Sequence, residues 1–500
     1  MPIHVFIRSV CAVVLLVHIL PALDQTASES ATASLNALSV DTLPPPPARL
    51  DHLSRSECLR LALTRNRGLR AAVADLQSNR FAISAVRSEL YAPTLTSSYT
   101  ATNAGDAAQT RLDGTAHVLG TEIKPYAQST WTQDVYDTGF NPYNSGFGLT
   151  ISRRWLGLAE QLRRRQPLTQ AEVSFLIAAN NVVITRKQVE ASATSAFLAV
   201  QRAKARVGLR EKRVESSRET LKMLRANIAN KLKAPIEEYN SLIELSQAEA
   251  DLLGERSNLT SAGERLSVML DLPVVTPINI EAEDLAAKSV TVSDQEKDVQ
   301  AAVTGSERLG ISHLELRLQR DQLAILRDNA WPTVTTGVDI GRWYQGPSPF
   351  RRSEGNEFED RAALTVSLTI PLDFYHGARS RWHAFERGVA QKNLRLAEAT
   401  ANTEQTVRET HRRIVRLIDT ARLSQERVEA ERRRLEATQI RYDAGSIDNL
   451  ELTRQRQSLD SAELFLLDAR IDLQTTLADY VALLPAPRGV DAEAVQGLAK

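Results

Sequence analysis

Few residues in this chain have the types and spacing that chemistry at a site requires. His376 and His383 would share a helix face, but they lie seven residues apart, whereas helical metal ligands lie about four apart. The two cysteines, Cys11 and Cys58, exclude a disulfide framework and a cysteine-based zinc site. The sequence has no glycine-rich phosphate loop, no nucleophile elbow and no pair of carboxylates in a catalytic context. We therefore expect neither enzyme activity nor a bound cofactor or metal.

The composition favours long helices and argues against nucleic-acid binding. Lysine plus arginine and aspartate plus glutamate both number 61, so the formal net charge is zero, whereas a nucleic-acid-binding chain would show a basic excess. Aromatic residues make up only 5% of the 500 residues, which suits helices better than a large β-sandwich. This length predicts more than one structural unit.

The N-terminus has the pattern of an export signal. A basic start precedes an apolar run from Val10 to Leu20, and a small residue follows. The run is too short to span a bilayer, which needs about 20 apolar residues. We expect residues 1–22 to be a signal peptide and residues 23–52, which contain a run of prolines, to be a linker.

The rest of the chain repeats one order of elements. Residues 53–275 and 306–486 each predict a helix, a β-hairpin, a long helix, a reversal and a returning helix, with a connector at 276–305 and a tail at 487–500. The helical parts align without a gap at an offset of 214 residues. Seam positions recur every seven residues in both outgoing helices, at Val200, Val207, Val214, Leu221 and Ile228 and at Ile414, Ala421, Val428, Leu435 and Tyr442.

These heptads predict two antiparallel, coiled-coil-like helical hairpins, at 158–270 and 377–484. The outgoing helix 377–441 would extend about 95–100 Å, which its own chain cannot cover alone. The reversals at 229–236 and 443–449 would form a tip.

Four segments of about nine residues alternate apolar with polar side chains, as strands between lipid and water do. They are 95–103, 145–153, 333–341 and 362–370, in hairpins expected at 94–153 and 333–371. About forty residues between the first two, containing many Gly, Asp, Asn and Thr, predict a long loop.

Four strands cannot close a barrel across a bilayer. An open edge would leave backbone groups unpaired in lipid, and transmembrane barrels have at least about eight strands. A membrane location therefore requires neighbouring copies, with eight strands from two or twelve from three. The alternative is a small soluble sheet beside a coiled coil, which would make the chain a soluble periplasmic adaptor or scaffold.

Short motifs mark the junctions between these elements. They are the opening helix segment 59–70, the junctions Ala92-Pro93-Thr94-Leu95 and Trp331-Pro332-Thr333-Val334, the exit 366–377, and the turn Arg441-Tyr442-Asp443-Ala444-Gly445. Together they resemble the outer-membrane efflux protein family, the TolC-like channel-tunnels, over about residues 53–485. Two positions depart from the family's pattern. Arg154 replaces an expected proline, and Lys231, which the 214-residue offset aligns with Gly445, replaces an expected glycine.

The resemblance implies a mainly α fold with a small β part. Three copies would each give four strands to a twelve-stranded barrel in the outer membrane of a Gram-negative-type bacterium. Their helices would form an α-barrel of about 100 Å in the periplasm. The homotrimer would be a passive export duct that works with a periplasmic adaptor (membrane fusion) protein and an inner-membrane efflux pump or secretion ATPase.

The resemblance also assigns roles at the tip. An aromatic residue and carboxylates near this turn restrict the pore in the family, which makes Tyr442, Glu451 and Arg454 gate candidates and Asp443 and Asp448 weaker ones. Arg454 lies where the enteric member has a second carboxylate, which favours ion pairs between neighbouring copies. The alternative is a solvated charged face. The expected tip turns and adaptor contacts are Asn230, Lys231, Lys233, Pro235, Ala444, Gly445 and Ser446.

Overall fold

The computed structural model describes most of the chain between residues 50 and 485. The described residues are 50–91, 94–101, 107–118, 121–132, 143–155, 160–230, 234–274, 276, 278–281, 294–328, 332–346, 359–370, 377–444, 446–447 and 449–485. The expected signal peptide, nearly all of the linker and the tail lie outside them.

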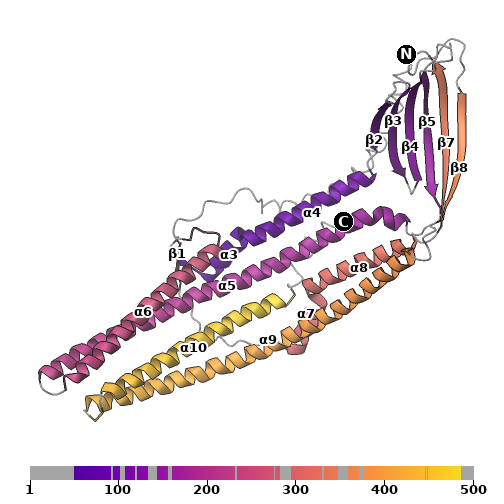
Figure 1. Cartoon of the computed structure of the whole chain (residues 1–500). Helices are drawn as coiled ribbons and strands as arrows, with labels where there is room; N and C mark the ends of the chain where they lie inside the picture. The colour runs from indigo at the N-terminus through magenta and orange to yellow at the C-terminus, as the bar shows by residue number, and fades with distance from the viewer. Residues whose placement is uncertain are drawn as a thin grey trace.

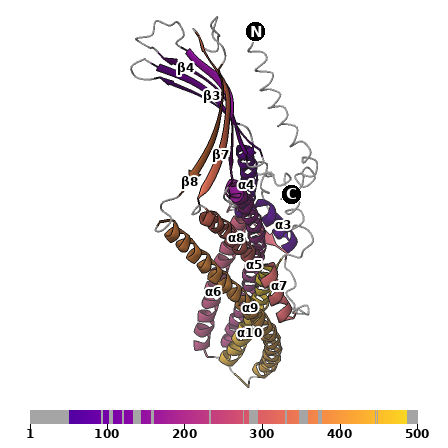
Figure 2. The ribbon, with the colours of Figure 1, turned by 90° about the vertical axis from the view of Figure 1, so that its right-hand side faces the viewer.

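The fold has a sheet at one end and long helices that extend away from it (Figure 1). The helices are α3 (Arg55–Arg65), α4 (Arg67–Tyr91), α5 (Glu160–Ala229), α6 (Ile236–Met269), α7 (Gln295–Gly305), α8 (Glu307–Asp328), α9 (Gly377–Asp443) and α10 (Asn449–Leu483). The strands are β1 (Leu50–Leu53), β2 (Thr94–Ala101), β3 (Ala107–Val118), β4 (Thr121–Thr132), β5 (Tyr143–Arg154), β6 (Ile278–Ile280), β7 (Thr333–Gly346) and β8 (Glu359–Thr369). The turned view confirms that the sheet sits beyond the helical part along its long axis (Figure 2).

The main sheet has six strands, so the prediction of four strands per copy is wrong. All neighbours are antiparallel, in the order β2-β3-β4-β5-β7-β8. The additional strands, β3 and β4, occupy the segment for which the sequence predicts a loop. Pro125 weakens their sequence signal because proline cannot donate to a strand ladder. Gly114 pairs with β2 opposite Leu95, and a Cβ on it would lie 2.9 Å from the Pro125 ring.

The first repeat begins with two helices separated by a polar capping residue, and the second has the same start because the last part of the predicted connector is a helix, α7. Asn66 ends α3, and its side-chain oxygen accepts hydrogen bonds from the backbone of Gly68 (2.9 Å) and Leu69 (3.2 Å) at the start of α4. Its amide donates to the carbonyl of Met269 at the end of α6 (3.3 Å). Ser306 occupies the matching position between α7 and α8. Asn66 of the opening motif thus separates α3 from α4 and anchors this break to the end of α6.

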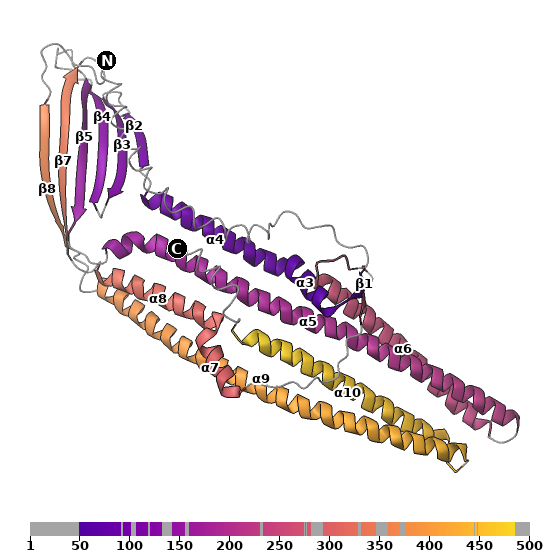
Figure 3. The same cartoon turned by 180° about the vertical axis from the view of Figure 1, so that it is seen from behind.

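The two helical hairpins, α5–α6 and α9–α10, extend with their turns at the end far from the sheet (Figure 3). The outgoing helices α5 and α9 have 70 and 67 residues, or about 100 Å each at 1.5 Å per residue. Val200 and Ile414, which the 214-residue offset relates, are both buried. The heptad seam is therefore the packed face of both hairpins. Within the described residues, no helix combines the length and apolarity needed to cross a membrane.

The largest cluster of buried apolar side chains joins the two repeats near the middle of the helices. It includes Leu53, Cys58, Phe197 and Leu266 from the first repeat and Ile471 from the second. The parallel pair of β1 and β6 closes over it, with Glu281 donating its backbone N–H to the carbonyl of Leu53 (3.1 Å). The connector is thus tied to the start of the first repeat.

Cys58 in this cluster should not react with iodoacetamide at pH 8 while the protein is folded. The thiolate is the reactive form, and burial raises the pKa of the Cys58 thiol to about 11. Mass spectrometry after alkylation, with and without denaturant, measures this protection. Met223→Cys, at an exposed position of α5, is the control that should be modified in the folded protein. Complete alkylation of Cys58 before unfolding would contradict the packing described here.

Candidate functional site

The six-stranded sheet has one polar face and one mainly apolar face, whose charged exceptions include the ion pair of Arg342 with Asp360 (2.5 Å). One row across the strands runs Thr96, Asp113, Tyr126, Gly148, Gly341 and Arg361. The adjacent row runs Ser97, Leu112, Ala127, Phe147, Arg342 and Asp360. The apolar face continues along β8 through Leu364, Val366 and Leu368, which are 60–73% exposed. Leu95 and Tyr99 on β2, at the other edge of the same face, are also about 70% exposed, and apolar side chains left open in this way mark a surface that something apolar must cover.

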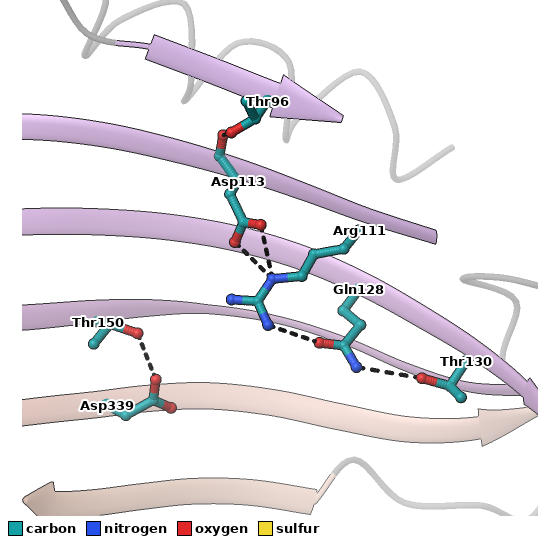
Figure 4. A network of polar contacts seen from close by, with 7 residues as sticks. All are labelled: Thr96, Arg111, Asp113, Gln128, Thr130, Thr150 and Asp339. Carbon is teal, nitrogen blue, oxygen red and sulfur yellow. Dashed lines mark hydrogen bonds and ion pairs between the residues drawn. The ribbon is translucent and has the colours of Figure 1, made fainter. Parts of the chain in front are cut away.

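Hydrogen bonds between side chains cross the polar face from strand to strand (Figure 4). The Arg111 guanidinium donates to Asp113 (2.7 Å) and to Gln128 on β4 (3.3 Å), and Gln128 donates onward to Thr130. Further along, Thr150 on β5 donates to Asp339 on β7 (2.6 Å). These partners satisfy one another within the sheet, so the polar face needs no protein layer packed on top of it.

Two large aromatic side chains of the polar face lie flat over glycines. Tyr126 extends from β4 over β5 and β7 to donate its hydroxyl proton to Asp339 (2.9 Å). A Cβ at Gly148 or Gly341 would lie 2.6 or 2.8 Å from the Tyr126 hydroxyl. Trp343 covers Gly146 in the same way, at 2.3 Å from a Cβ placed there. Glycine at these positions lets the rings lie along the sheet, where Arg111 lies over the Tyr126 ring and Arg361 over the Trp343 ring, each at 5.5 Å from the ring centre.

Aromatic residues also gather on the apolar face, near the strand ends farthest from the helices. Trp131 pairs directly with Tyr143, and Tyr344 pairs with Ser145 beside them. Tyr99 lies near the same end of β2 and is exposed. Of the four aromatic residues between positions 131 and 143, Trp131 and Tyr143 belong to β4 and β5, whereas Tyr136 and Phe140 lie outside the described residues. Trp131, Tyr143, Tyr344 and Tyr99 thus lie near the same end of the sheet, on one face.

In the helical part, arginines of α5 connect the first repeat to the second. Arg206 contacts Asp468 of α10 (2.7 Å), and Arg202 contacts both Asp468 (3.5 Å) and Asp472. These side chains are about one-third exposed or less, apart from Asp472. The ion pairs therefore hold the two hairpins together along their length.

The same row continues towards the tip. Arg210 and Arg213 both approach Asp251 of α6, at 3.6 and 3.4 Å, and Arg213 lies 4.0 Å from Asp460 of α10. Burial raises the pKa of Asp460, and nearby arginines oppose that rise. None of these arginines was predicted from the sequence to join the helices. The signal for the row is the spacing of arginines at 202, 206, 210 and 213, which places them on one helix face.

Reversing one charge of this row should weaken the helical assembly. Arg206→Asp brings two carboxylates together and should lower the free energy of unfolding by about 1–2 kcal/mol. Asp468→Arg should also destabilise, and the double exchange should recover part of the loss. Circular dichroism melts measure these differences. Arg256→Glu, which breaks the exposed pair with Glu211, is the matched control with a smaller expected loss. Equal losses in Arg206→Asp and the control would argue against the row's joining role.

The structure brings three of the five gate candidates together at the turn of the second hairpin. Tyr442 is half-buried in the last turn of α9, and Glu451 and Arg454 are exposed in the first turns of α10. The side chain of Asp443 and all of Asp448 lie outside the described residues. Thr453 donates to Glu244 of α6 (3.2 Å), so this turn contacts the first hairpin.

The expected tip turns are described in part. Asn230 ends the first outgoing helix with its N–H bonded to the carbonyl of Ala226 (3.1 Å), and Pro235 precedes α6. Ala444 and Ser446 donate their N–H groups back to the last turn of α9. Lys231, Lys233 and Gly445 lie outside the described residues. Arg225 and Glu238 connect the two sides of the first turn at 2.8 Å.

Comparisons with known proteins agree with this architecture. Residues 299–484, which run from within α7 to the end of α10, match the model of the family described as outer membrane efflux protein. No curated protein sequence matches the chain. Among solved structures, the outer membrane protein VceC from Vibrio cholerae is similar with a TM-score of 0.63 and 16% identity, covering 86% of this chain and 95% of that chain.

Two further channels show the same likeness. The Campylobacter jejuni CmeC outer membrane channel has a TM-score of 0.62 and 11% identity, covering 92% of this chain and 94% of its own. The Neisseria gonorrhoeae MtrE outer membrane channel, in its open state, has a TM-score of 0.62 and 17% identity, covering 88% and 93%. The resemblance seen in the junction motifs is confirmed: this chain has the fold of the TolC-like outer-membrane channels, and its second repeat matches the outer membrane efflux protein family.

Proposed function

We propose that three copies of this chain form a passive export duct through the outer membrane of a Gram-negative-type bacterium. The sheets would close into a barrel in the membrane, and the helical hairpins would continue the duct into the periplasm. The observation that carries this proposal is the division of the sheet into an exposed apolar face and a hydrogen-bonded polar face. Lipid suits the first face, and a water-filled lumen suits the second.

The free edges of the sheet support assembly from several copies. Strands β2 and β8 each have one neighbouring strand among the described residues, so their outer backbone groups have no strand partner in this part of the chain. Each unpaired backbone group costs roughly 2–7 kcal/mol in lipid. Pairing β8 of one copy with β2 of the next would remove both edges. A single six-stranded sheet is smaller than the transmembrane barrels known, which have at least about eight strands.

The helices support the same assembly. Ile236, Tyr239 and Ile243 form an apolar stripe on α6 with three- and four-residue spacing, and each is more than 60% exposed. Leu394 and Ile440 are similarly open on α9. Neighbouring hairpins in a helical barrel would cover these side chains.

Tyr442, Glu451 and Arg454, with Asp443 and Asp448, are proposed to restrict the pore at the periplasmic tip. Threefold symmetry would repeat Glu451 and Arg454 around the axis, where each can pair with its neighbour's opposite charge. The turn residues Asn230, Lys231, Lys233, Pro235, Ala444, Gly445 and Ser446 are proposed to meet a periplasmic adaptor. An inner-membrane efflux pump or secretion ATPase would supply the energy, because the duct is passive.

Neutralising the two charges of the second turn should open this restriction. Glu451→Gln with Arg454→Gln should raise single-channel conductance in planar bilayers, by about two-fold or more if one ion-pair ring limits the current. Glu249→Gln with Arg218→Gln is the matched control, because it removes an exposed pair of the same charges from the side of the first hairpin. Unchanged conductance in the tip variant would remove these residues from the gate.

Cell fractionation distinguishes the duct from the alternative of a soluble periplasmic adaptor or scaffold. The duct predicts that the chain sediments with outer membranes and stays there after a carbonate wash. A pool released into the periplasmic fraction would instead support the adaptor. The exposed Leu364, Val366 and Leu368 already disfavour a soluble sheet, since an open apolar face of this extent promotes aggregation in water.

A further inference from the structure

We infer that the hairpin β3–β4 is part of the barrel wall, so that three copies of this chain form an eighteen-stranded barrel with a wide, electrically balanced lumen. The inference rests on the proposed duct and adds the size and lining of its outer-membrane part. It departs from the twelve strands that the family resemblance implies.

The hairpin is paired in register on both sides. Ser97 of β2 pairs with Leu112, Leu112 with Ala127, and Ala127 with Phe147 of β5. The row crosses four strands without a shift. A hairpin that merely rested on the mouth of a four-stranded sheet would leave β2 beside β5, yet β2 contacts β3 and β5 contacts β4 over their lengths.

Side-chain bonds reinforce both seams of the hairpin. Thr96 of β2 donates its hydroxyl proton to the carbonyl of Asp113 on β3 (3.3 Å; Figure 4). On the apolar face, the hydroxyls of Ser129 on β4 and Ser145 on β5 are hydrogen-bonded at 2.8 Å, and both are buried. Tyr126 extends beyond β5 to Asp339 on β7. The inserted strands thus bond to β2 and β5 of the first repeat and to β7 of the second.

In the hairpin, polar and apolar side chains alternate between the same two faces as in the rest of the sheet. Arg111 and Gln128 belong to the polar face, whereas Leu112, Ile123 and Trp131 belong to the apolar face. A one-residue slip would reverse this division and place Arg111 towards lipid. The hairpin therefore meets the physical condition for a membrane wall along its whole paired length.

Adding a hairpin leaves barrel closure possible. It contributes one strand in each direction, so strand direction still alternates from β2 to β8 and the two edges remain antiparallel to each other. Eighteen is an even number of strands, as antiparallel closure requires. With a spacing of about 4.8 Å and a tilt of about 40°, the backbone diameter would be roughly 36 Å, against roughly 24 Å for twelve strands.

The polar face has a balanced set of charges across the described strands. The cationic residues are Arg111, Lys124, Arg154 and Arg361, and the anionic residues are Asp113, Glu122, Asp339 and Glu359. Most of them pair within their own strand, as Lys124 does with Glu122 (3.0 Å) and Arg361 with Glu359 (2.7 Å). A lining of this kind sets up little net field, so the barrel would pass bulky polar solutes of either charge.

Two pairs of cysteines in a Cys58→Ser background test the wall directly. The first variant, Ser129→Cys with Ser145→Cys, places one cysteine on β4 and one on β5. The second variant, Ser97→Cys with Phe147→Cys, places one cysteine on β2 and one on β5. In the eighteen-stranded wall the first pair is adjacent, whereas the second is three strand spacings apart, about 14 Å, too far for a disulfide. We expect oxidised trimers to contain only the first disulfide.

A variant that lacks residues 105–134 is the matched control. Its β2 can pair with β5 with the faces unchanged, because Ser97 and Phe147 lie in one row, so the second cysteine pair should now form. Neutral poly(ethylene glycol) added from the outer side should enter the full-length barrel at a larger size than it enters this variant. Equal size limits would overturn the wide lumen.

The outcomes separate this inference from the proposed function. A disulfide between positions 97 and 147 in full-length trimers would place the hairpin outside the wall and overturn the inference, while the duct would stand. A chain that forms no trimer in the membrane would overturn both. Six strands per copy in an electron cryo-microscopy map of the trimer would support the inference.

Discussion

Leu364→Arg should abolish stable insertion into the outer membrane, whereas Thr365→Arg, one residue away, should not. Leu364 lies near the middle of β8 on the apolar face and is 73% exposed, and Thr365 points to the polar face. An arginine facing lipid near the bilayer midplane costs about 2–4 kcal/mol per copy, and a trimer would bear that cost three times. In the lumen the same side chain stays hydrated.

Heat-modifiable trimer bands from purified outer membranes measure the difference. The control matters because both variants add the same side chain to the same strand, so a general effect on expression or export would reduce both. Loss of both trimers, or of neither, would contradict the assignment of the two faces. A selective loss in Thr365→Arg would reverse it.

Phe197→Ala should produce the largest loss of stability among single truncations in the helical part. Phe197 is 1% exposed in the cluster that joins α3, α5, α6 and α10. Removing a buried aromatic ring loses its burial and leaves a cavity, which together cost about 3–5 kcal/mol. The loss should appear as a lower midpoint in helical circular dichroism melts.

Met223→Ala is the control for Phe197→Ala, because it truncates a large side chain of the same helix at a position that is 51% exposed. It should shift the midpoint little. Since Phe197 lies in one copy's own core, its effect should persist when trimers are dissociated in detergent. Destabilisation only in the trimer would place Phe197 at an interface between copies instead.

The helical half of the fold could be predicted from sequence because its signal is long and redundant. Val200 and Ile414 belong to heptads that repeat over many turns and recur at a fixed offset, and both are buried at the seam. Errors of one or two residues at helix ends do not alter such a pattern. The break between α3 and α4 at Asn66 was not predicted, because a single capping residue interrupts an otherwise continuous apolar period.

The sheet was harder because strand signals are short and each strand depends on its neighbours. The strand β4 alternates Ile123, Pro125, Ala127 and Trp131 with polar residues, but a proline inside a strand argues against a central position. The Pro125 ring fits against Gly114 on β3, where a Cβ would lie 2.9 Å from it, and that local fit is visible only after folding. The polar bonds of Arg111 and Tyr126 likewise depend on partners from other strands.

The tip candidates came from family resemblance, and the geometry groups Tyr442, Glu451 and Arg454 at one turn. The arginine row of α5 was missed, although its spacing was present in the sequence. Charged residues on a long helix usually form a solvated face. Only the partners Asp468 and Asp251 show that these arginines form ion pairs between helices instead. Those partners come from other helices, so no local pattern identifies them.

Native mass spectrometry of the complex extracted from outer membranes in mild detergent tests the central claim most directly. Each copy has a sheet with two open edges, so lipid forces it to share them with neighbours. We predict a single species with the mass of three chains, and no monomer until the detergent denatures the sheet. A folded monomer that remains in the membrane fraction would contradict the account.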